Sequence, residues 1–351
     1  MTVTHAPVLV TGAAGFVASH VVSLLLARGY TVRGTVRSLA KVKDLAPLRA
    51  LPGAAERLEL VEADLLSAAA FEAAAVGCEI VIHTASPYTL DAKDPQRDLV
   101  DPAVQGTENV LAACKKAGTV RRVVLTSSMA AITDEPEGDR VLTEKDWNTR
   151  STLERNPYYL SKTLAERAAW AFVERERPGF DLVVINPFLI IGPSIGPSLN
   201  TSNQLFVDLL KGTYPGVMNL TWGFVDVRDV AEAHVRAMEN DAASGRYVCA
   251  GETIAMRPLV ELLESSGWGR GNKLPKLGMD CAVGDFAVKV SSYLQPKGVG
   301  SYLRTHVGRV PRYDTAKIRR ELGVDFRPVA ESVLDTMADL ASWGHAPAKQ
   351  A

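Results

Sequence analysis

The stretch that decides the fold is Val8-Leu9-Val10-Thr11-Gly12-Ala13-Ala14-Gly15-Phe16-Val17-Ala18, near the start of the chain. Its first residues form a short apolar strand, and the glycines allow a tight turn directly before a helix. Gly12 permits the turn, and Gly15 lets the backbone approach a pyrophosphate, which the free N–H groups of the helix N-terminus bind. Ala18, at the third glycine position, still allows close packing of helix on strand. The residues expected at this phosphate site are Gly12, Ala14, Gly15, Phe16 and Val17.

Short β-type runs alternate with longer helical stretches through the first 190 residues. Several of the runs are continuously apolar, as buried parallel strands are. The expected strands are Val8–Thr11, Thr31–Val36, Leu58–Glu62, Ile80–His83, Arg122–Thr126 and Leu182–Asn186, and the expected helices include Phe16–Arg28, Pro102–Ala117 and Pro157–Glu176. This alternation predicts an α/β fold of the Rossmann type, with a doubly wound parallel sheet.

After Pro187 the composition of the chain changes, and the alternation of strands and helices does not resume at once. The stretch IIGPSIGPSLNTSNQ is rich in Gly, Pro and Ser, and a loop-rich piece beyond the carboxyl edge of a sheet suits a substrate site. A strand and helix at Gly223–Glu239 and a strand at Arg246–Cys249 suggest a return to the sheet. We therefore expect residues 1–187, with a return at about 223–250, to form the dinucleotide-binding domain. Residues 188–222 and 251–345 are expected to form a smaller, mostly C-terminal substrate-binding region.

The end of the second expected strand indicates which dinucleotide is bound. Proteins of this fold that prefer NAD place Asp or Glu there to bind the ribose 2′-OH, whereas an Arg binds a 2′-phosphate. The chain has Arg37 at this point, with Lys41 as a second candidate cation. The sequence thus predicts NADPH or NADP+. Asp64, followed by Leu65 after the third strand, is expected either to bond the adenine amine or to cap the next helix.

Three residues are expected to carry the chemistry. The strand ending at Thr126 runs into Ser127-Ser128, and the segment NPYYLSK places Tyr158 and Lys162 at i and i+4, on one face of a helix that begins after Asn156. A free phenol is a poor base at neutral pH, and a nearby ammonium favours its ionised form. The pattern therefore predicts proton exchange with an alcohol or ketone at Tyr158.

The remaining roles in this constellation follow from the same chemistry. Lys162 would also hold the nicotinamide ribose, and Ser128 would donate a hydrogen bond to the substrate carbonyl oxygen. Ser127 is an alternative to Ser128. Tyr159 lies three residues from Lys162 rather than four, so packing or pocket lining is expected of it.

Bulk composition narrows the class of protein. The 351 residues carry a formal net charge of -1, which argues against nucleic acid as a partner, and no apolar stretch is long enough to span a membrane. The N-terminus does not resemble a signal peptide. Four cysteines lack metal-type spacing, so we expect no metal site, mostly buried free thiols and a cytoplasmic location. The expected partner is a small molecule, bound by a monomer or a homodimer.

Six segments, taken in order, resemble the extended short-chain dehydrogenase/reductases. They are TGAAGFVASH, VIHTASP, VVLTSS, YYLSKTLAE, INPFLIIGP and FVDVRDVAEAH. Within that family they are most similar to the dihydroflavonol 4-reductase-like branch, which includes cinnamoyl-CoA reductases and yeast methylglyoxal/isovaleraldehyde reductases. The resemblance covers residues 7 to about 255 and thins in the last hundred residues.

The resemblance implies further site residues. Contacts with the cofactor are implied for Thr84, Ala85, Ser86, Thr126, Pro187, Leu189, Ile190 and Ser202, with Asn203 as an alternative to Ser202. The substrate pocket is implied at Ser86–Tyr88, Met129–Thr133, Leu199–Leu205 and near Trp222–Phe224. The resemblance also implies that His83 and His234 are structural.

One departure from the family bears on the substrate. Plant dihydroflavonol reductases have an Asn shortly after the catalytic serine that reads the flavonoid hydroxyls, and Thr133 stands there in this chain. The sequence therefore favours a broader NADPH-dependent aldehyde or ketone reductase. The alternatives are a nucleotide-sugar epimerase or dehydratase, a 3β-hydroxysteroid dehydrogenase-like enzyme and a non-catalytic NADP sensor.

Overall fold

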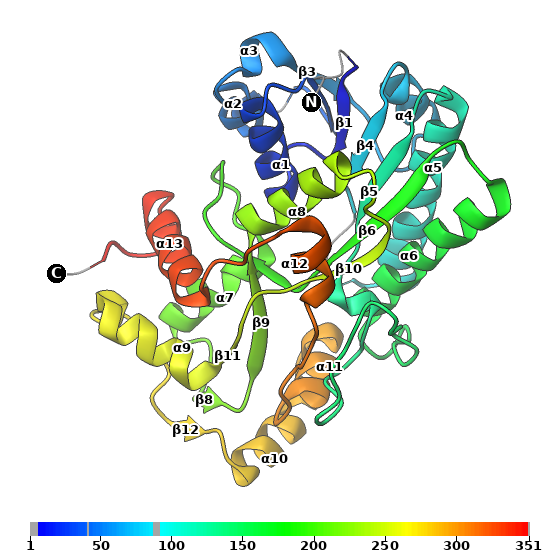
Figure 1. Ribbon diagram of the computed structural model, residues 1–351. Helices are drawn as coiled ribbons and strands as arrows, with labels where there is room; N and C mark the ends of the chain where they lie inside the picture. The colour runs from blue at the N-terminus through cyan, green and yellow to red at the C-terminus, as the bar shows by residue number, and fades with distance from the viewer. Residues whose placement is uncertain (1–5, 41, 87–91, 350–351) are drawn as a thin grey trace.

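The structure is a computed structural model that describes residues 6–40, 42–86 and 92–349. Two residues named above, Lys41 and Tyr88, lie outside this part of the chain. Figure 1 shows a larger body around a central sheet, with a second body, built from other parts of the C-terminal half of the chain, below it.

The central sheet has seven parallel strands in the order β10-β6-β5-β4-β1-β2-β3. Its members are β1 (Val8–Thr11), β2 (Val32–Val36), β3 (Leu58–Glu62), β4 (Ile80–His83), β5 (Arg122–Thr126), β6 (Asp181–Pro187) and β10 (Gly245–Cys249). This confirms the predicted doubly wound parallel sheet, with strand ends within a residue of expectation. β1 and β4 are buried along their whole length, and β6 everywhere except Asp181, because helices cover both faces of the sheet.

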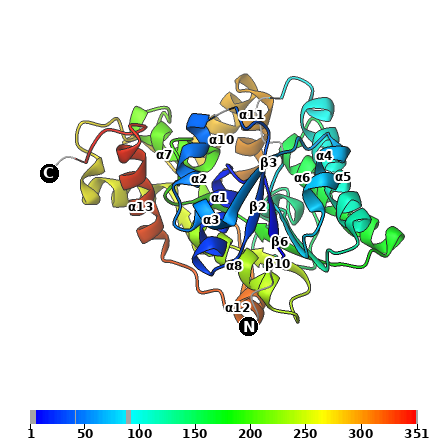
Figure 2. The same ribbon diagram turned by 90° about the horizontal axis from the view of Figure 1, so that it is seen from above.

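Helices cover the sheet in two layers (Figure 2). On one side α1 (Phe16–Ala27) packs against α8 (Val227–Glu239), and α2 (Val42–Arg49) and α3 (Ala54–Arg57) lie nearby. On the other side lie α4 (Ala68–Ala75), α5 (Asp101–Ala117) and α6 (Pro157–Glu176). A π-helical turn at Gln96–Val100 leads into α5, and a short 3-10 turn at Met129–Ala131 follows β5.

The second body is built around a three-stranded sheet in the order β11-β9-β7. Its strands are β7 (Leu189–Ile191), β9 (Thr221–Asp226) and β11 (Thr253–Ala255), with a separate pair formed by β8 (Val217–Met218) and β12 (Gly278–Met279). The surrounding helices are α7 (Thr201–Lys211), α9 (Met256–Leu263), α10 (Ala282–Ser291), α11 (Lys297–His306) and α13 (Val329–Ser342), with helical turns at Glu264–Trp268 and Ser292–Leu294. By contrast, α12 (Ala316–Leu322) packs against α8 and β10 of the larger body.

The segment expected to return to the main sheet is divided between the two bodies. α8 and β10 do return, since α8 packs on β5 and β6 and β10 pairs with β6. The strand at 221–226 instead pairs with β7 and β11. All six residues of β9 are buried, as expected for a central strand covered on both faces.

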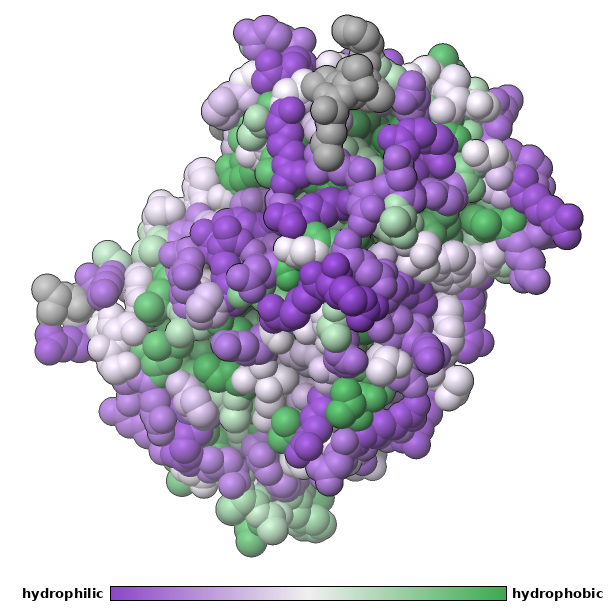
Figure 3. Space-filling view, in the orientation of Figure 1, coloured by the Kyte–Doolittle hydropathy of each residue, from purple (hydrophilic) through white to green (hydrophobic). Residues whose placement is uncertain are grey.

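Hydrophobic side chains gather on the outer face of α10. Val283, Phe286 and Val290 follow helical spacing and are exposed, and Leu294 after the helix is 89% exposed. Figure 3 shows this region as the apolar end of the second body. Within α10 itself only Gly284 and Val288 are buried.

Candidate active site

The parallel sheet brings the predicted segments to one edge. In the β1–β4 pair Thr11 is opposite His83, and in the β5–β6 pair Thr126 is opposite Ile185. Because the strands are parallel, the turn after Thr11, the residues after His83 and the serines after Thr126 all leave the sheet at its carboxyl edge. Ligands of open α/β sheets bind at this edge.

The glycine-rich turn fits a pyrophosphate. Gly12 has φ +66°, and a Cβ there would lie 3.1 Å from the Cβ of Ala85. α1 begins at Phe16 with Gly15 as its N-cap, so no side chain caps the helix, and its first turn has no acidic residue. Ala14 and Gly15 are exposed, while Phe16 and Val17 are partly buried. These uncapped N–H groups and the positive end of the helix dipole are what an anion requires.

Thr11 ties the end of β4 to this turn. Its hydroxyl accepts hydrogen bonds from the backbone N–H groups of Thr84 and Ala85 at 3.1 and 3.0 Å, and the Thr84 hydroxyl donates to the Thr11 carbonyl at 2.5 Å. Thr84 and Ala85 therefore lie beside the glycine-rich turn. Ser86 follows them and is partly buried.

Arg37 follows β2 at the same edge. Its side chain is exposed, and among the described residues it has no hydrogen-bond or ion-pair partner. By contrast, Arg33, four residues earlier, is bound to Glu59 and to backbone carbonyls of the Ala74–Val76 segment. Arg37 is thus available for an external anion.

Asp64 and Leu65, which follow β3 and were expected near the cofactor, make contacts within the protein. The Asp64 carboxylate accepts a hydrogen bond from the Leu66 N–H at 2.9 Å, which closes a local turn. Asp64 therefore does not cap α4, whose N-cap is Ser67, and its side chain is exposed. Leu65 is partly buried, packs against Gly106, and its carbonyl accepts from Asn109.

The two serines after β5 have different environments. The Ser127 hydroxyl is buried and donates to Glu166 at 2.5 Å. The Ser128 hydroxyl is partly buried and accepts from the Ala130 N–H at 3.1 Å, where it caps the 3-10 turn. A hydroxyl that only accepts keeps its proton for another acceptor. This difference favours Ser128 as the donor to a substrate carbonyl.

Tyr158 and Lys162 lie together in the first two turns of α6. The Lys162 Nζ is 5.9 Å from the centre of the Tyr158 ring, and both side chains are partly buried. Burial lowers the pKa of Lys162 to about 8, so its amine is still mostly protonated at pH 7. The ammonium that the Tyr158 phenol requires is therefore present at neutral pH.

Asn156 precedes α6 as predicted, but its side chain does not cap the helix. The residue is in the left-handed region with φ 51°, and its amide donates to the Asp134 carboxylate at 2.9 Å. Its own N–H donates to the Ser301 hydroxyl on α11 at 3.1 Å. Tyr159 is packed edge-on against His306 of the same helix, with ring centres 6.0 Å apart. The start of α6 is thus held by the second body.

His83 and His234 are fully buried next to the site. Nδ1 of His83 lies 2.8 Å from the Thr11 hydroxyl, and burial, aided by the charge of Lys162, lowers the pKa of His83 to about 3. Burial also lowers the pKa of His234 to about 4. Both rings are neutral at physiological pH and bonded within the protein, which fits a structural role.

The other residues implied for the cofactor side flank the junction of the two bodies. Pro187 is the buried last residue of β6, and Leu189 and Ile190 are partly buried in β7. Ser202 is partly buried in the first turn of α7. Asn203 is fully buried, and its amide donates to the Gly192 carbonyl at 2.9 Å. Of this pair, Ser202 is the more accessible.

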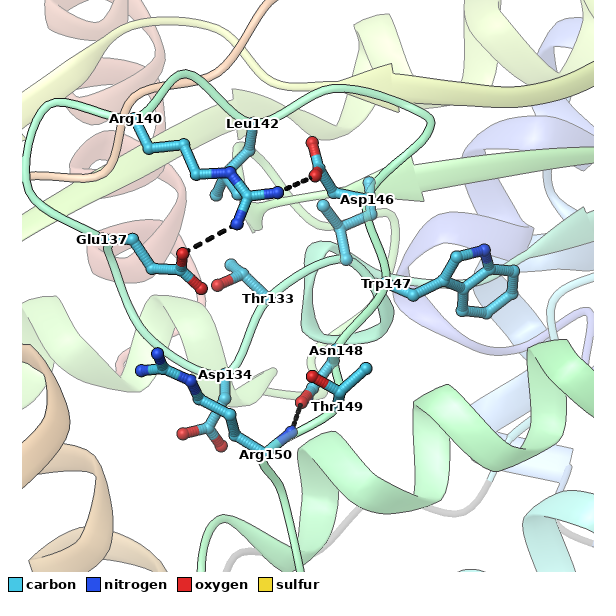
Figure 4. Close-up of a pocket in the computed structure, with 11 residues that line it drawn as sticks. Thr133, Asp134, Glu137, Arg140, Leu142, Asp146, Trp147, Asn148, Thr149 and Arg150 are labelled. Carbon is cyan, nitrogen blue, oxygen red and sulfur yellow. Dashed lines mark hydrogen bonds and ion pairs between the residues drawn. The ribbon is translucent and has the colours of Figure 1, made fainter.

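The segment Met129–Thr133 does not form an open wall. Met129 and Ile132 are buried in a cluster with Leu142 and Val248, and the Thr133 hydroxyl donates to the Glu135 carbonyl. The small cavity beside it, shown in Figure 4, has a volume of about 20 Å³ and is lined mostly by polar residues between 132 and 150. It has room for a water molecule but not for an organic substrate.

Sequence reasoning missed a buried polar cluster beneath the site. Its centre is Glu166, whose carboxylate accepts hydrogen bonds from Ser127, Asn186 and Arg246. The available signal was its position on α6, four residues after Lys162, where a carboxylate shares the helix face that points inward. Among the described residues, no group of His, Cys, Asp and Glu could hold a metal ion.

The described part of the chain offers neither a membrane-spanning helix nor a disulfide bond. No helix there is both long enough and apolar enough to cross a bilayer. All four cysteines are free, and Cys78, Cys114 and Cys249 are buried, as predicted, whereas Cys281 is exposed.

A glycine-rich turn before a helix, an exposed arginine after β2 and a Ser–Tyr–Lys set at one sheet edge define a dinucleotide-dependent oxidoreductase of the extended short-chain dehydrogenase/reductase type. The chain belongs to the NAD-dependent epimerase/dehydratase family, whose model matches residues 8–250.

Similar proteins place it more narrowly among reductases. The chain is 47% identical over 255 residues to a cinnamoyl-CoA reductase of Medicago truncatula, covering 71% of this chain and 76% of that protein. It is 38% identical to tetraketide alpha-pyrone reductase 1 of Arabidopsis thaliana over 96% of each protein. The crystal structure of yeast methylglyoxal/isovaleraldehyde reductase complexed with NADPH matches with a TM-score of 0.76 and 30% identity, over 96% of this chain and 98% of that one.

Proposed function

We propose that this chain reduces the carbonyl group of an aldehyde or ketone to an alcohol with NADPH, reversibly, at Ser128, Tyr158 and Lys162. The observation that carries the proposal is the position of Tyr158 and a protonated Lys162 on one face of α6, next to the sheet edge where Ser128 and the glycine-rich turn lie. NADPH supplies the hydride when it is bound.

Each of the three side chains has a defined task. The Ser128 hydroxyl donates to the carbonyl oxygen and stabilises the negative charge that develops there. Tyr158 then gives its phenolic proton to the same oxygen, and the ammonium of Lys162 stabilises the phenolate that remains. Because Ser127 already donates to Glu166, the second serine is the better donor.

The choice of NADPH over NADH rests on Arg37. An exposed guanidinium without a partner among the described residues suits the 2′-phosphate, which takes charge-assisted hydrogen bonds. The phosphates themselves would be held at Gly12–Val17, and the adenine side at Asp64 and Leu65. The NADPH complex of the yeast relative supports this choice.

The two bodies have different proposed roles, one in binding the cofactor and the other in binding the substrate. We assign the cofactor to residues 1–187 with the return at about 223–250, and the substrate to residues 188–222 and 251–345. Packing of α8 and β10 on the central sheet supports the first part, while the pairing of β9 with β7 moves residues 221–226 towards the second. All three proposed catalytic residues come from one chain, so a monomer or a homodimer would serve. Free thiols favour a cytoplasmic location.

The experiment that tests the function is NADPH oxidation against a panel of carbonyl compounds. The panel contains aliphatic aldehydes, diketones, aryl ketones, a cinnamoyl thioester and a dihydroflavonol, each repeated with NADH. We expect turnover with NADPH on simple carbonyls. Binding of NADPH without turnover on any member would reject the reductase and favour a nucleotide-sugar epimerase or dehydratase. That alternative is tested with UDP-sugars.

A further inference from the structure

Tyr158, Lys162 and Glu166 occupy positions i, i+4 and i+8 of α6 and so share one helix face. The first two residues are partly buried at the sheet edge, whereas the Glu166 side chain is completely buried. A carboxylate buried this deeply needs strong partners, since desolvation opposes its charge.

Three strands supply those partners. The Ser127 hydroxyl at the end of β5 donates to Glu166 Oε2 at 2.5 Å, and the Asn186 amide of β6 donates to the same oxygen at 2.8 Å. Arg246 of β10 donates from Nε to Oε1 at 2.5 Å. The Trp170 indole, from α6 itself, donates to Oε1 at 3.2 Å. One carboxylate therefore joins the helix to three adjacent strands of the sheet.

Arg246 is itself fixed in place. Its Nη1 donates to the carbonyls of Glu144 and Asp146 at 3.0 and 2.5 Å, and its guanidinium lies over the Trp147 ring at 4.0 Å. The charge of Glu166 is thus neutralised by a cation that cannot move freely.

Two of these contacts lead directly to Ser128. Ser127 is its neighbour in the chain, and the Asn186 amide also donates to the Ser128 carbonyl at 3.2 Å. Glu166 consequently holds Ser128 from both sides, through Ser127 and through Asn186, from the helix that carries Tyr158 and Lys162.

We propose that Glu166 is a positioning residue for carbonyl reduction, which sets the separation between Ser128 and the Tyr158–Lys162 pair by anchoring Ser127 and Asn186. This inference rests on the proposed function. A substrate oxygen must accept from Ser128 and receive a proton from Tyr158 at once, so a small displacement of either group lowers the rate of the chemical step.

The test compares two variants that each remove one hydrogen bond to Glu166 in the full chain. Ser127→Ala removes one of the bonds that cross from the helix to the strands. Trp170→Phe removes a bond from the same helix and is the matched control, because it leaves the link between elements intact. The turnover number, the KM values for NADPH and carbonyl, the NADPH dissociation constant and the melting temperature are measured for each, with kinetics well below the melting temperature.

We expect Ser127→Ala to lower kcat about tenfold with little change in NADPH affinity, and Trp170→Phe to keep the kcat of the parent protein. Glu166→Gln, where it folds, should lower kcat further. A parental kcat for Ser127→Ala, or an equal fall in both single variants, would overturn the positioning role. A different result would reject the proposed function itself. That result is retention of turnover by Ser128→Ala and Tyr158→Phe.

Discussion

The hydroxyl of Thr126 lies 2.7 Å from Nε2 of His234, and Nδ1 of the same ring lies 2.7 Å from the Val230 carbonyl oxygen. A carbonyl only accepts, so Nδ1 carries the ring proton, and Nε2 accepts from Thr126. The last residue of β5 is thereby joined to α8 by a neutral imidazole. Thr126 has committed its hydroxyl proton to this contact, so its hydroxyl could only accept a hydrogen bond from a cofactor.

Acid should weaken the fold through His234. Its pKa is about 4 in the folded protein against 6.5 when unfolded, so the unfolded chain binds more protons between these values, and stability falls as the pH drops through this window. One such histidine costs about 2 kcal/mol at pH 5. Denaturant unfolding at pH 7 and pH 5 measures this loss.

We expect His234→Leu to be less stable at pH 7 but to lose less between pH 7 and pH 5. Thr126→Val is the matched control, because it removes the same hydrogen bond and keeps the ring that titrates. Equal pH dependence in His234→Leu and the parent protein would show that His234 does not contribute.

Tyr158→Phe should lower kcat by about 10² to 10⁴-fold, since only the proton donor is lost. NADPH binding, followed by the fluorescence of the cofactor, should change little. Tyr159→Phe is the control, because that ring packs against His306 and is expected to retain most of the rate. Retention of most of the parental rate by Tyr158→Phe would reject the catalytic assignment.

Arg37→Asp should shift the cofactor preference from NADPH towards NADH. The 2′-phosphate loses charge-assisted hydrogen bonds, and the ratio of kcat/KM values for NADPH and NADH should fall about 10- to 100-fold. Arg49→Asp, at an exposed position at the end of α2, makes the same change in net charge away from the proposed phosphate. An unchanged ratio in Arg37→Asp would mean that Arg37 is an ordinary surface residue.

Lys162→Met should abolish most turnover yet raise the melting temperature of the cofactor-free protein at pH 7 by a few degrees. Burial lowers the pKa of Lys162 from 10.5 to about 8, so its protonated form is disfavoured in the folded state. The unfolded chain binds more protons between pH 8 and 10.5, and the parent protein gains stability over that range as the pH rises. The advantage of the variant should therefore shrink from pH 7 to pH 10 in thermal scans. A variant that melts lower at pH 7 would contradict this.

Local chemistry made much of the fold predictable. The apolar runs at Val8–Thr11 and Ile80–His83 are buried on both faces of the sheet. A continuous run of apolar residues is typical of such strands, so both could be predicted without knowing their neighbours. The turn at Gly12 and the first residue of α1 are determined by a few adjacent residues, so both could be predicted from a short stretch of sequence. The pairing of Tyr158 with Lys162 depends on helix geometry alone, and such spacing is visible in a sequence.

Long-range partners were not visible in this way. Glu166 and Arg246 are 80 residues apart, and nothing in either segment specifies that they meet. A strand beginning at about Gly223 was expected to return to the main sheet, but the observed strand at 221–226 pairs with β7 and β11. Asn156 was placed correctly before α6, yet its amide binds Asp134, which the helix-start pattern does not encode.

Arg246 also has a consequence for the synthesis of the chain. A ribosome adds about 5–20 residues per second, so the roughly 60 residues between Pro187 and Arg246 take several seconds to appear. During that interval β6 is the open edge of a six-stranded sheet, and an unpaired edge is a template for association with other chains. Glu166 has already been made and lacks its counter-charge. Arrival of β10 covers β6, becomes the new edge strand and neutralises the carboxylate in one event, so an open β6 edge and an unpaired buried charge no longer occur together.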